Sequence, residues 1–213
     1  MTVTDLGLID FHSAYGIQVQ LAAEIAAGRA PETLILLEHP PVYTIGSGGD
    51  SANILDPAIQ VTRTNRGGDV TFHGPGQLVG YPLVNLASRG RDLHRYLRFL
   101  ESFLISVAED SGVNAYAVPG RTGVWTDGGK LASIGVGVRR WVTMHGFALN
   151  VSNDLAPFAL INPCGMPECK VTSLSRQTGG DISLQEVKRR VAESFSALLN
   201  ISLPLVQLAL NQL

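Results

Sequence analysis

Two long β-type segments separated by a single residue constrain the fold more than any other feature. Residues 130–139 alternate apolar with small or polar side chains, Ile134, Val136 and Val138 lying on one face, and residues 141–151 follow directly. A period of two predicts strands, and so short a connection forces them to pair antiparallel. Because a lone hairpin is only marginally stable in water, these strands predict a larger sheet with a covered face.

Other predicted strands, and three predicted helices, precede and follow this hairpin in the sequence. Strands are predicted at residues 3–9, 34–37, 42–45, 69–73, 77–85, 113–118 and 122–126. Helical periodicity predicts helices at residues 12–27, 92–111 and 184–199, with Asp92 and Ser183 as N-caps of the last two. Strands outnumber helices and come in runs, so we expect an α+β fold with helices packed on a mostly antiparallel sheet.

Composition excludes several classes of protein. A chain of 213 residues that is 45% apolar can bury a full core without a disulfide or metal. A net charge of −2 with 16% charged residues excludes a polybasic nucleic-acid binder and a coiled coil. No segment approaches the ~18 consecutive apolar residues of a membrane helix, and no basic residue precedes the first apolar run as in a signal peptide. We expect a single domain over residues 1–213, in the cytoplasm, without nucleic-acid or membrane partners.

The residue types that bind metals or form disulfides are sparse. Cys164 and Cys169 are too few for a disulfide framework and are not spaced as a CxxC motif, which favours a reducing compartment. The five histidines stand singly, and none forms an HxH or HxxxH pair. We therefore expect no metal site.

Glycine is in excess, with 23 residues, and much of it falls in segments that also carry reactive side chains. The first, residues 66–77, places Arg66, Thr71 and His73 beside glycines that let a ligand approach the backbone closely. It contains no Walker A lysine, and no GxGxxG motif opens a helix there. From composition alone it is equally a hairpin with tight turns.

Two further segments carry a lysine and a cysteine. Lys130 follows two glycines at the start of an apolar strand, where it is either a solvated strand end or a lysine held in a pocket. Cys164 lies between Pro163 and Gly165, which predicts a rigid turn. Such a cysteine is either an inert small hydrophobe or a nucleophile that needs an activating base or cation.

Five motifs occur in an order and spacing that resemble the lipoyl(octanoyl) transferases of lipoate biosynthesis, the resemblance being strongest over residues 34–199. They are Arg66-Gly-Gly-Asp-Val-Thr-Phe-His-Gly-Pro-Gly-Gln77, Gly120-Arg-Thr-Gly-Val-Trp125, Gly129-Lys-Leu-Ala-Ser-Ile-Gly135, His145-Gly-Phe-Ala-Leu-Asn150, and Pro163-Cys-Gly165 with Val171-Thr-Ser-Leu174.

The resemblance implies a fold similar to the catalytic domain of lipoate and biotin protein ligases, a mixed sheet flanked by helices. It also implies an acyltransferase that takes octanoyl from the phosphopantetheine of acyl carrier protein, with no other cofactor. The implied acceptor is a specific lysine in the lipoyl domains of 2-oxoacid dehydrogenase subunits and in the glycine cleavage H protein.

The family's site residues map onto matching positions of this chain. Its cysteine nucleophile falls on Cys164 and its lysine partner on Lys130. Its substrate-binding stretches fall on Arg66, Gly67, Gly68, Asp69, Val70, Thr71, Phe72, His73, Ser133, Ile134, Gly135, Gly146, Phe147 and Ala148. Residues 166–169 and the loop at 46–53 depart from the family pattern, and Cys169 receives no role.

This chemistry is consistent with acyl transfer through a thioester on Cys164, with Lys130 stabilising the thiolate and shuttling protons. Backbone amides near Gly165 or within residues 66–73 are the predicted oxyanion donors. Arg139 and Arg140 are candidates for a basic patch that receives an acidic carrier protein.

Three other activities remain open from the sequence. An ATP-dependent lipoate or biotin ligase of the same fold activates a free acid and needs no cysteine. A thioesterase passes the acyl group to water instead of an amine. A module that binds acyl carrier protein without catalysis forms no acyl-enzyme at all.

Overall fold

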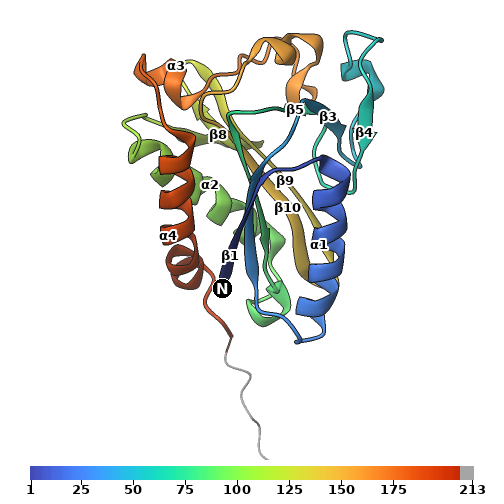
Figure 1. The fold of residues 1–213 in the computed structure, drawn as a ribbon, viewed down its shortest axis with the longest axis vertical. Coiled ribbons are helices and arrows are strands. Elements are labelled where there is room, and N and C mark those ends of the chain that lie inside the picture. The colour runs from blue at the N-terminus through green and yellow to red at the C-terminus, as the bar shows by residue number, and fades with distance from the viewer. Residues whose placement is uncertain (207–213) are drawn as a thin grey trace, which may run out of the picture.

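The computed structural model describes residues 1–206, arranged as a central sheet with helices on both faces (Figure 1). Positions 207–213 of the predicted domain lie outside the described residues. The sheet has seven strands in the order β1-β2-β6-β10-β9-β8-β7. Their bounds are β1 Thr2–Leu8, β2 Thr33–Glu38, β6 Gln77–Leu83, β7 Tyr116–Val118, β8 Arg121–Thr126, β9 Gly129–Arg139 and β10 Val142–Asn150.

Neighbouring strands of this sheet are antiparallel except β1 and β2, which are parallel. The predicted α+β class with a mixed, mostly antiparallel sheet is therefore confirmed. The β9–β10 hairpin is present, but its turn has two residues instead of one. Arg140 and Trp141 have φ of 50° and 63°, the positive values that a tight two-residue hairpin turn needs at both central positions. Trp141 thus belongs to the turn and not, as predicted, to the strand.

Helices cover the two faces of the sheet separately (Figure 1). Helix α1 (Phe11–Ala26) packs on one face, over β6 and β10. Helices α2 (Leu93–Glu109) and α4 (Leu184–Ser202) pack together on the other. Asp92 and Ser183 accept hydrogen bonds from backbone N–H groups of the first turns, which confirms the two predicted N-caps.

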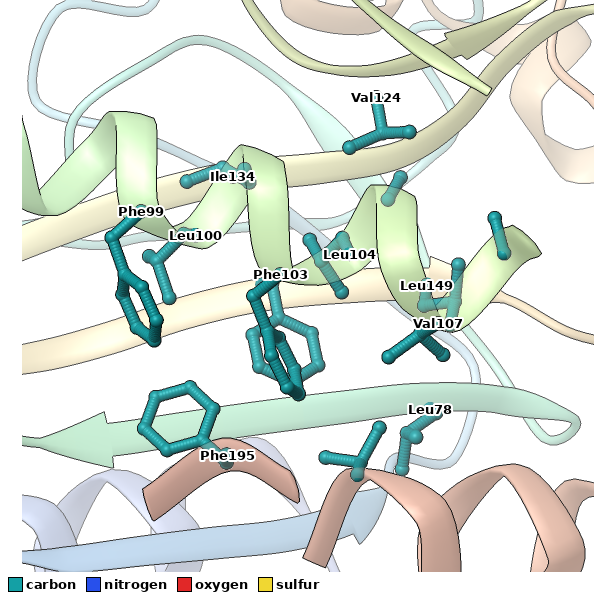
Figure 2. Close-up of a cluster of buried hydrophobic side chains, with 14 of the residues drawn as sticks. Leu78, Phe99, Leu100, Phe103, Leu104, Val107, Val124, Ile134, Leu149 and Phe195 are labelled. Carbon is teal, nitrogen blue, oxygen red and sulfur yellow. The ribbon is translucent and has the colours of Figure 1, made fainter. Parts of the chain in front are cut away.

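Figure 2 shows the core between α2, α4 and the sheet. The ring of Phe103 in α2 meets that of Phe195 in α4 edge to face, with centroids 4.9 Å apart. Phe103 also faces Phe147 of β10. A Cβ atom at Gly80 would lie 2.1 Å from the Phe147 ring, so only glycine leaves room for it there. This packing fixes a side chain that lines the pocket described below.

A small second sheet lies at one end of the large one, in the order β4-β3-β5 (Figure 1). Its strands are β3 Val42–Ile45, β4 Val61–Arg63 and β5 Thr71–His73. A separate apolar cluster, which includes Ile45, Phe72 and Phe158, holds it against the loops of residues 155–161. Neither β4 nor the five-residue helix α3 (Leu174–Thr178) was predicted, because elements this short carry too few residues to show a period.

Candidate active site

Cys164 lies on a strained turn that aims its thiol at the end of the large sheet. The turn is a short 3₁₀ helix, η4 (Pro163–Gly165), in which Cys164 has φ 56° and ψ 29°. A non-glycine residue in the left-handed region is uncommon and is held by its surroundings. The Cys164 N–H donates to the Val70 carbonyl, and the Gly165 N–H donates to Asn162. The predicted rigid turn is therefore confirmed.

Lys130, the second residue of β9, reaches this thiol. Its Nζ lies 2.9 Å from Cys164 Sγ, 3.3 Å from the Thr122 carbonyl oxygen and 5.2 Å from the centre of the Trp125 ring. Only 2% of Lys130 is exposed, so of the two alternatives the solvated strand end is wrong. A Cβ at Gly123 would lie 2.8 Å from Lys130 Cε, and that glycine therefore makes room for the lysine stem.

Among the described residues, Lys130 has no acidic side chain as an ion-pair partner beside Cys164. None of the ion pairs within residues 1–206 includes Lys130. A buried ammonium without a carboxylate lacks compensation for its desolvation, and an adjacent thiolate supplies it. The arrangement therefore suits a nucleophilic cysteine beside a group that can give and take a proton.

A pocket opens from Cys164 into the interior between the sheet and α1. Twelve of the predicted site residues line it: Arg66, Gly68, Asp69, Thr71, His73, Ser133, Ile134, Gly135, Gly146, Phe147, Ala148 and Cys164. Gly135 and Gly146 stand opposite each other on β9 and β10, and a Cβ atom there would lie 2.8 Å from the Gly67 oxygen or 2.4 Å from the Gly80 oxygen, respectively, so only glycine lets these segments approach. The structure thus brings together stretches from three distant parts of the chain.

Val70 and Phe72 do not line the pocket, although they belong to the predicted stretch. Successive residues of a strand point to opposite sides, so Thr71 and His73 face the pocket while their neighbours face away. Val70 and Phe72 are buried in the small apolar cluster beside Phe158. They support the site but have no access to a bound molecule in it.

Four lining residues were not predicted: Phe11, Val79, Tyr81 and His145. Phe11 begins α1, and its ring stacks near His145 with a centroid distance of 6.3 Å. Val79 and Tyr81 are alternate residues of β6, so the period of two in the sequence places them on the same face of that strand. Nothing in the sequence shows which face of that strand borders a cavity, since both of its faces are buried.

Buried polar groups form an ordered chain along the pocket wall. Arg66 donates to the Thr44 hydroxyl, which lies 3.3 Å from His73 Nε2. His73 Nδ1 lies 2.8 Å from Gln77 Oε1, and Gln77 Nε2 donates to Asn150 Oδ1. Only a neutral His73 with its proton on Nδ1 satisfies every partner, and burial lowers the pKa of His73 to about 3.

Arg66 is a buried cation that faces the pocket. It is 9% exposed, and its guanidinium donates to the carbonyl oxygens of Thr44 and Gly67 and to the Thr44 hydroxyl. The ion pairs formed within the described part of the chain do not include it. The pocket mouth at Cys164 therefore carries two buried basic side chains, Arg66 and Lys130, and one carboxylate, Asp69, which accepts hydrogen bonds from Asn53 Nδ2 and the Val70 N–H.

Thr71 carries an unsatisfied hydroxyl in this pocket. Its Oγ1 is buried without a hydrogen-bond partner among the described residues. Because an unpaired buried hydroxyl costs free energy, its retention points to a polar partner supplied by a bound molecule. The Gly165 N–H, one of the backbone amides predicted as oxyanion donors, donates to the Asn162 carbonyl oxygen in this structure.

We expect the protein to lose stability between pH 7 and pH 5. Burial lowers the pKa of His73 to about 3 and of His145 to about 4, from an ordinary value of 6.5. Below pH 6.5 these two histidines bind protons in the unfolded chain but stay neutral in the folded chain. The free energy of unfolding therefore falls as the pH falls towards the lowered pKa values.

The two histidines together account for a loss of about 3 kcal/mol at pH 5, measurable as the free energy of urea unfolding. A His145→Gln variant should lose less between the two pH values than the wild type does. Equal stability of the wild type at pH 7 and pH 5 would contradict the assignment of both histidines as buried and neutral.

A second hollow, which we call the outer groove, meets the pocket at Cys164. It is lined by Gly67, Leu93, Leu97, Arg121, Lys130, Val136 and Met166, together with Gly68, Ile134 and Gly135, which also border the pocket. Cys164 therefore borders both hollows, and Lys130 lines the outer groove beside it. Within residues 1–206 no group of three or more histidine, cysteine or acidic side chains is placed to hold a metal, and no helix is long and apolar enough to cross a membrane.

Comparison with known proteins gives the family. The model of the lipoyl protein ligase A/B catalytic domain matches residues 10–196. An octanoyltransferase of Geotalea uraniireducens is 67% identical over 96% of this chain and 96% of its own length. An octanoyltransferase of Geobacter metallireducens is 65% identical over 98% of both chains.

Solved structures agree in fold. A putative lipoate protein ligase from T. acidophilum has a TM-score of 0.70 at 17% identity and covers 93% of this chain and 85% of its own. Biotin protein ligase from Aquifex aeolicus has a TM-score of 0.56 at 13% identity, over 94% of this chain and 70% of its own. The chain thus belongs to the lipoyl protein ligase A/B catalytic-domain family, where it is an acyltransferase that groups with the octanoyltransferases.

Proposed function

We propose that this protein transfers octanoyl from octanoyl-acyl carrier protein to a lysine of a lipoyl domain, through a thioester on Cys164. The observation that carries the proposal is the 2.9 Å contact between Lys130 Nζ and Cys164 Sγ, at the junction of the pocket and the outer groove. A cysteine suits this reaction because the acyl-enzyme is a thioester of energy similar to the donor.

In the first half-reaction the Cys164 thiolate attacks the carbonyl carbon of the donor thioester. The tetrahedral intermediate collapses, the carbon–sulfur bond to phosphopantetheine breaks, and the ammonium of Lys130 protonates the departing thiolate. Lys130 is then neutral and Cys164 carries the octanoyl group.

In the second half-reaction the neutral amine of the target lysine attacks the Cys164 thioester. The amide bond forms, the bond to Cys164 Sγ breaks, and Lys130 takes the proton that the amine releases. The pair of thiolate and ammonium is thereby restored. Because donor thiol and acceptor amine both exchange protons with Lys130, they use the same position in turn, which predicts ping-pong kinetics.

The octanoyl chain occupies the pocket between the sheet and α1 in this proposal. Apolar contact comes from Phe11, Val79, Ile134, Phe147 and Ala148. Each buried methylene contributes about 0.8 kcal/mol, so the chain supplies several kcal/mol of binding free energy. The pocket excludes water from the thioester and so favours transfer over hydrolysis.

Thr71 is the proposed donor to the acyl carbonyl oxygen, because its hydroxyl faces the pocket without a partner. Thr71→Val removes that donor with little change of shape, and we expect kcat to fall by about 10²-fold. Its melting temperature should not fall, since the substitution removes an unpaired buried hydroxyl. Thr71→Ser keeps the hydroxyl and is the matched control. Wild-type kcat in Thr71→Val would exclude the hydroxyl from catalysis.

The acceptor and the compartment are part of the same proposal. A fold relative, the bi-partite lipoate protein ligase of Thermoplasma acidophilum, was solved as part of a lipoylation system with its E2 lipoyl domain, which supports lipoyl domains as acceptors. The proposed acceptors are those of 2-oxoacid dehydrogenase subunits and the glycine cleavage H protein. We assign the reaction to the cytoplasm, because a reducing compartment keeps Cys164 a free thiol, and we propose no cofactor beyond the donor's phosphopantetheine.

The products of one incubation test this function. The protein is mixed with octanoyl-acyl carrier protein and an unmodified lipoyl domain, without ATP, and all species are weighed by mass spectrometry. We expect octanoylated lipoyl domain and free carrier protein. Release of free octanoate alone would indicate a thioesterase, and octanoylation only from free octanoate with ATP would indicate a ligase. No acyl transfer at all would indicate a module that only binds the carrier.

A further inference from the structure

The outer groove extends well past the reacting pair, further than a lysine side chain needs. From Lys130 and Cys164 it follows β9 along Ile134 and Val136, with Leu93 and Leu97 of α2 as its wall. A second hollow beside it is lined by the same Leu93 together with Val138, Arg140 and Trp141. The two hollows lie on either side of Leu93, one beside Cys164 and the other beside the hairpin turn, and we call them together the path.

The floor of this path is one face of β9. Ile134, Val136 and Val138 are alternate residues and point to the same side of the strand. Four residues of strand separate Ile134, beside the nucleophile, from Val138, which corresponds to about 13 Å at ~3.3 Å per residue. Val138 and Trp141 are each 39% exposed, unlike the buried side chains nearer Cys164.

Exposed arginines stand at both ends of the path. Arg121 lines the part near Lys130, and Arg140 lines the far end. Arg91 lies over the Trp141 ring, 5.9 Å from its centre. None of these three belongs to an ion pair within the part of the chain that the structure describes. Two acids lie near these arginines: Asp92 caps α2 by accepting from the Arg95 N–H, and Glu168 lines a neighbouring hollow with Arg121.

The positive charge of these arginines is opposite in sign to the net charge of the whole chain, which is −2. Arg139, the other arginine predicted for a basic patch, precedes Arg140 on the strand and does not line the path. We call Arg91, Arg140 and Trp141, together with Val138, the hairpin corner. It combines positive charge with exposed apolar surface, the composition of a docking site for an acidic partner.

We propose that the outer groove holds the phosphopantetheine arm of the acyl donor and that the hairpin corner binds its acidic carrier protein. This inference rests on the proposed function and assigns the donor, not the acceptor, to this surface. The arm is long, largely uncharged and flexible, and it ends in a phosphate. Laid along β9 with its sulfur at Cys164, it brings that phosphate towards Arg140, whereas a lysine side chain is too short to span the path.

Half-reactions separate donor from acceptor binding. In Arg91→Glu/Arg140→Glu we expect kcat/KM for octanoyl-enzyme formation from octanoyl-acyl carrier protein to fall by about 10²-fold, with a weaker dependence on salt. Formation from octanoyl-pantetheine, which lacks both phosphate and carrier, should keep its wild-type rate. Transfer from preformed octanoyl-enzyme to a lipoyl domain should also be unchanged.

Two further variants complete the test. Arg29→Glu/Arg189→Glu makes the same change in net charge on exposed arginines of other surfaces, and it should behave as wild type. Val138→Glu places a negative charge on the exposed floor of the path and should slow the carrier-dependent step alone.

The inference is overturned if the hairpin-corner variants accept octanoyl from the carrier at the wild-type rate. It is also overturned if they slow transfer to the lipoyl domain instead, because the surface would then belong to the acceptor. Failure of the proposed function itself is distinguishable, since the wild-type protein would then form no octanoyl-enzyme from either donor.

Discussion

Replacing Cys164 with serine is expected to abolish octanoyl transfer, with a loss of at least about 10³-fold in kcat. A serine hydroxyl in this position stays protonated beside Lys130, so it lacks the nucleophilic form that the thiol provides. The rate is measured with octanoyl-acyl carrier protein and a lipoyl domain at saturating concentrations. Cys164→Ala should show the same loss and should accumulate no acylated protein.

Cys169 provides a matched control in the same loop. It is the other free cysteine of the described chain, and its thiol lies 3.7 Å from the Lys170 carbonyl oxygen. Cys169→Ser should transfer octanoyl at a rate within a few-fold of wild type. Near-normal activity in Cys164→Ser, or its loss in Cys169→Ser with Cys164 intact, would refute the assignment of the nucleophile.

Replacing Lys130 should produce the second large effect, and two variants divide its roles. Lys130→Met removes the charge from a buried side chain of similar length, and we expect kcat to fall by 10²–10⁴-fold. Lys130→Arg keeps a positive charge beside the sulfur but cannot release a proton at neutral pH. It should therefore lose most of the transfer activity while Cys164 stays reactive.

Alkylation of Cys164 by iodoacetamide at pH 7 reports on that reactivity separately from transfer. We expect alkylation to slow markedly in Lys130→Met and to stay close to the wild-type rate in Lys130→Arg. Melting temperatures show whether each variant folds, because Lys130 is packed against Gly123 and Trp125. Full transfer activity in Lys130→Arg would show that Lys130 acts only as a charge and moves no proton.

The sequence predicted the large elements well because they carry long periodic patterns. The 130–151 hairpin and helices α2 and α4 each contain several repeats of their period, and two of the helices carry an N-cap. The hairpin turn was predicted with one residue instead of two. Positive φ is usually marked by glycine or asparagine, and positions 140 and 141 are arginine and tryptophan. Strand β4 and helix α3 were missed for want of length.

The candidate site was predictable only in part. Patterns along the chain left Lys130 as either a strand end or a pocket residue, and the ordered family motifs alone paired it with Cys164. Burial of Lys130 depends on Gly123 of the neighbouring strand β8 and on the loop that carries Cys164, which lies 34 residues further along the chain. Tyr81 and His145 were not predicted as pocket residues for the same reason, because only the assembled sheet brings their strands to the pocket.

The octanoyl-enzyme itself tests the central claim most directly. The protein is mixed with one equivalent of octanoyl-acyl carrier protein, without a lipoyl domain, and its intact mass and Cys164-containing peptide are measured. The account predicts a mass increase of one octanoyl group located on Cys164, which disappears when an unmodified lipoyl domain is added and reappears as an amide on that domain. Octanoyl transfer to the lipoyl domain with no octanoyl ever found on Cys164 would contradict it.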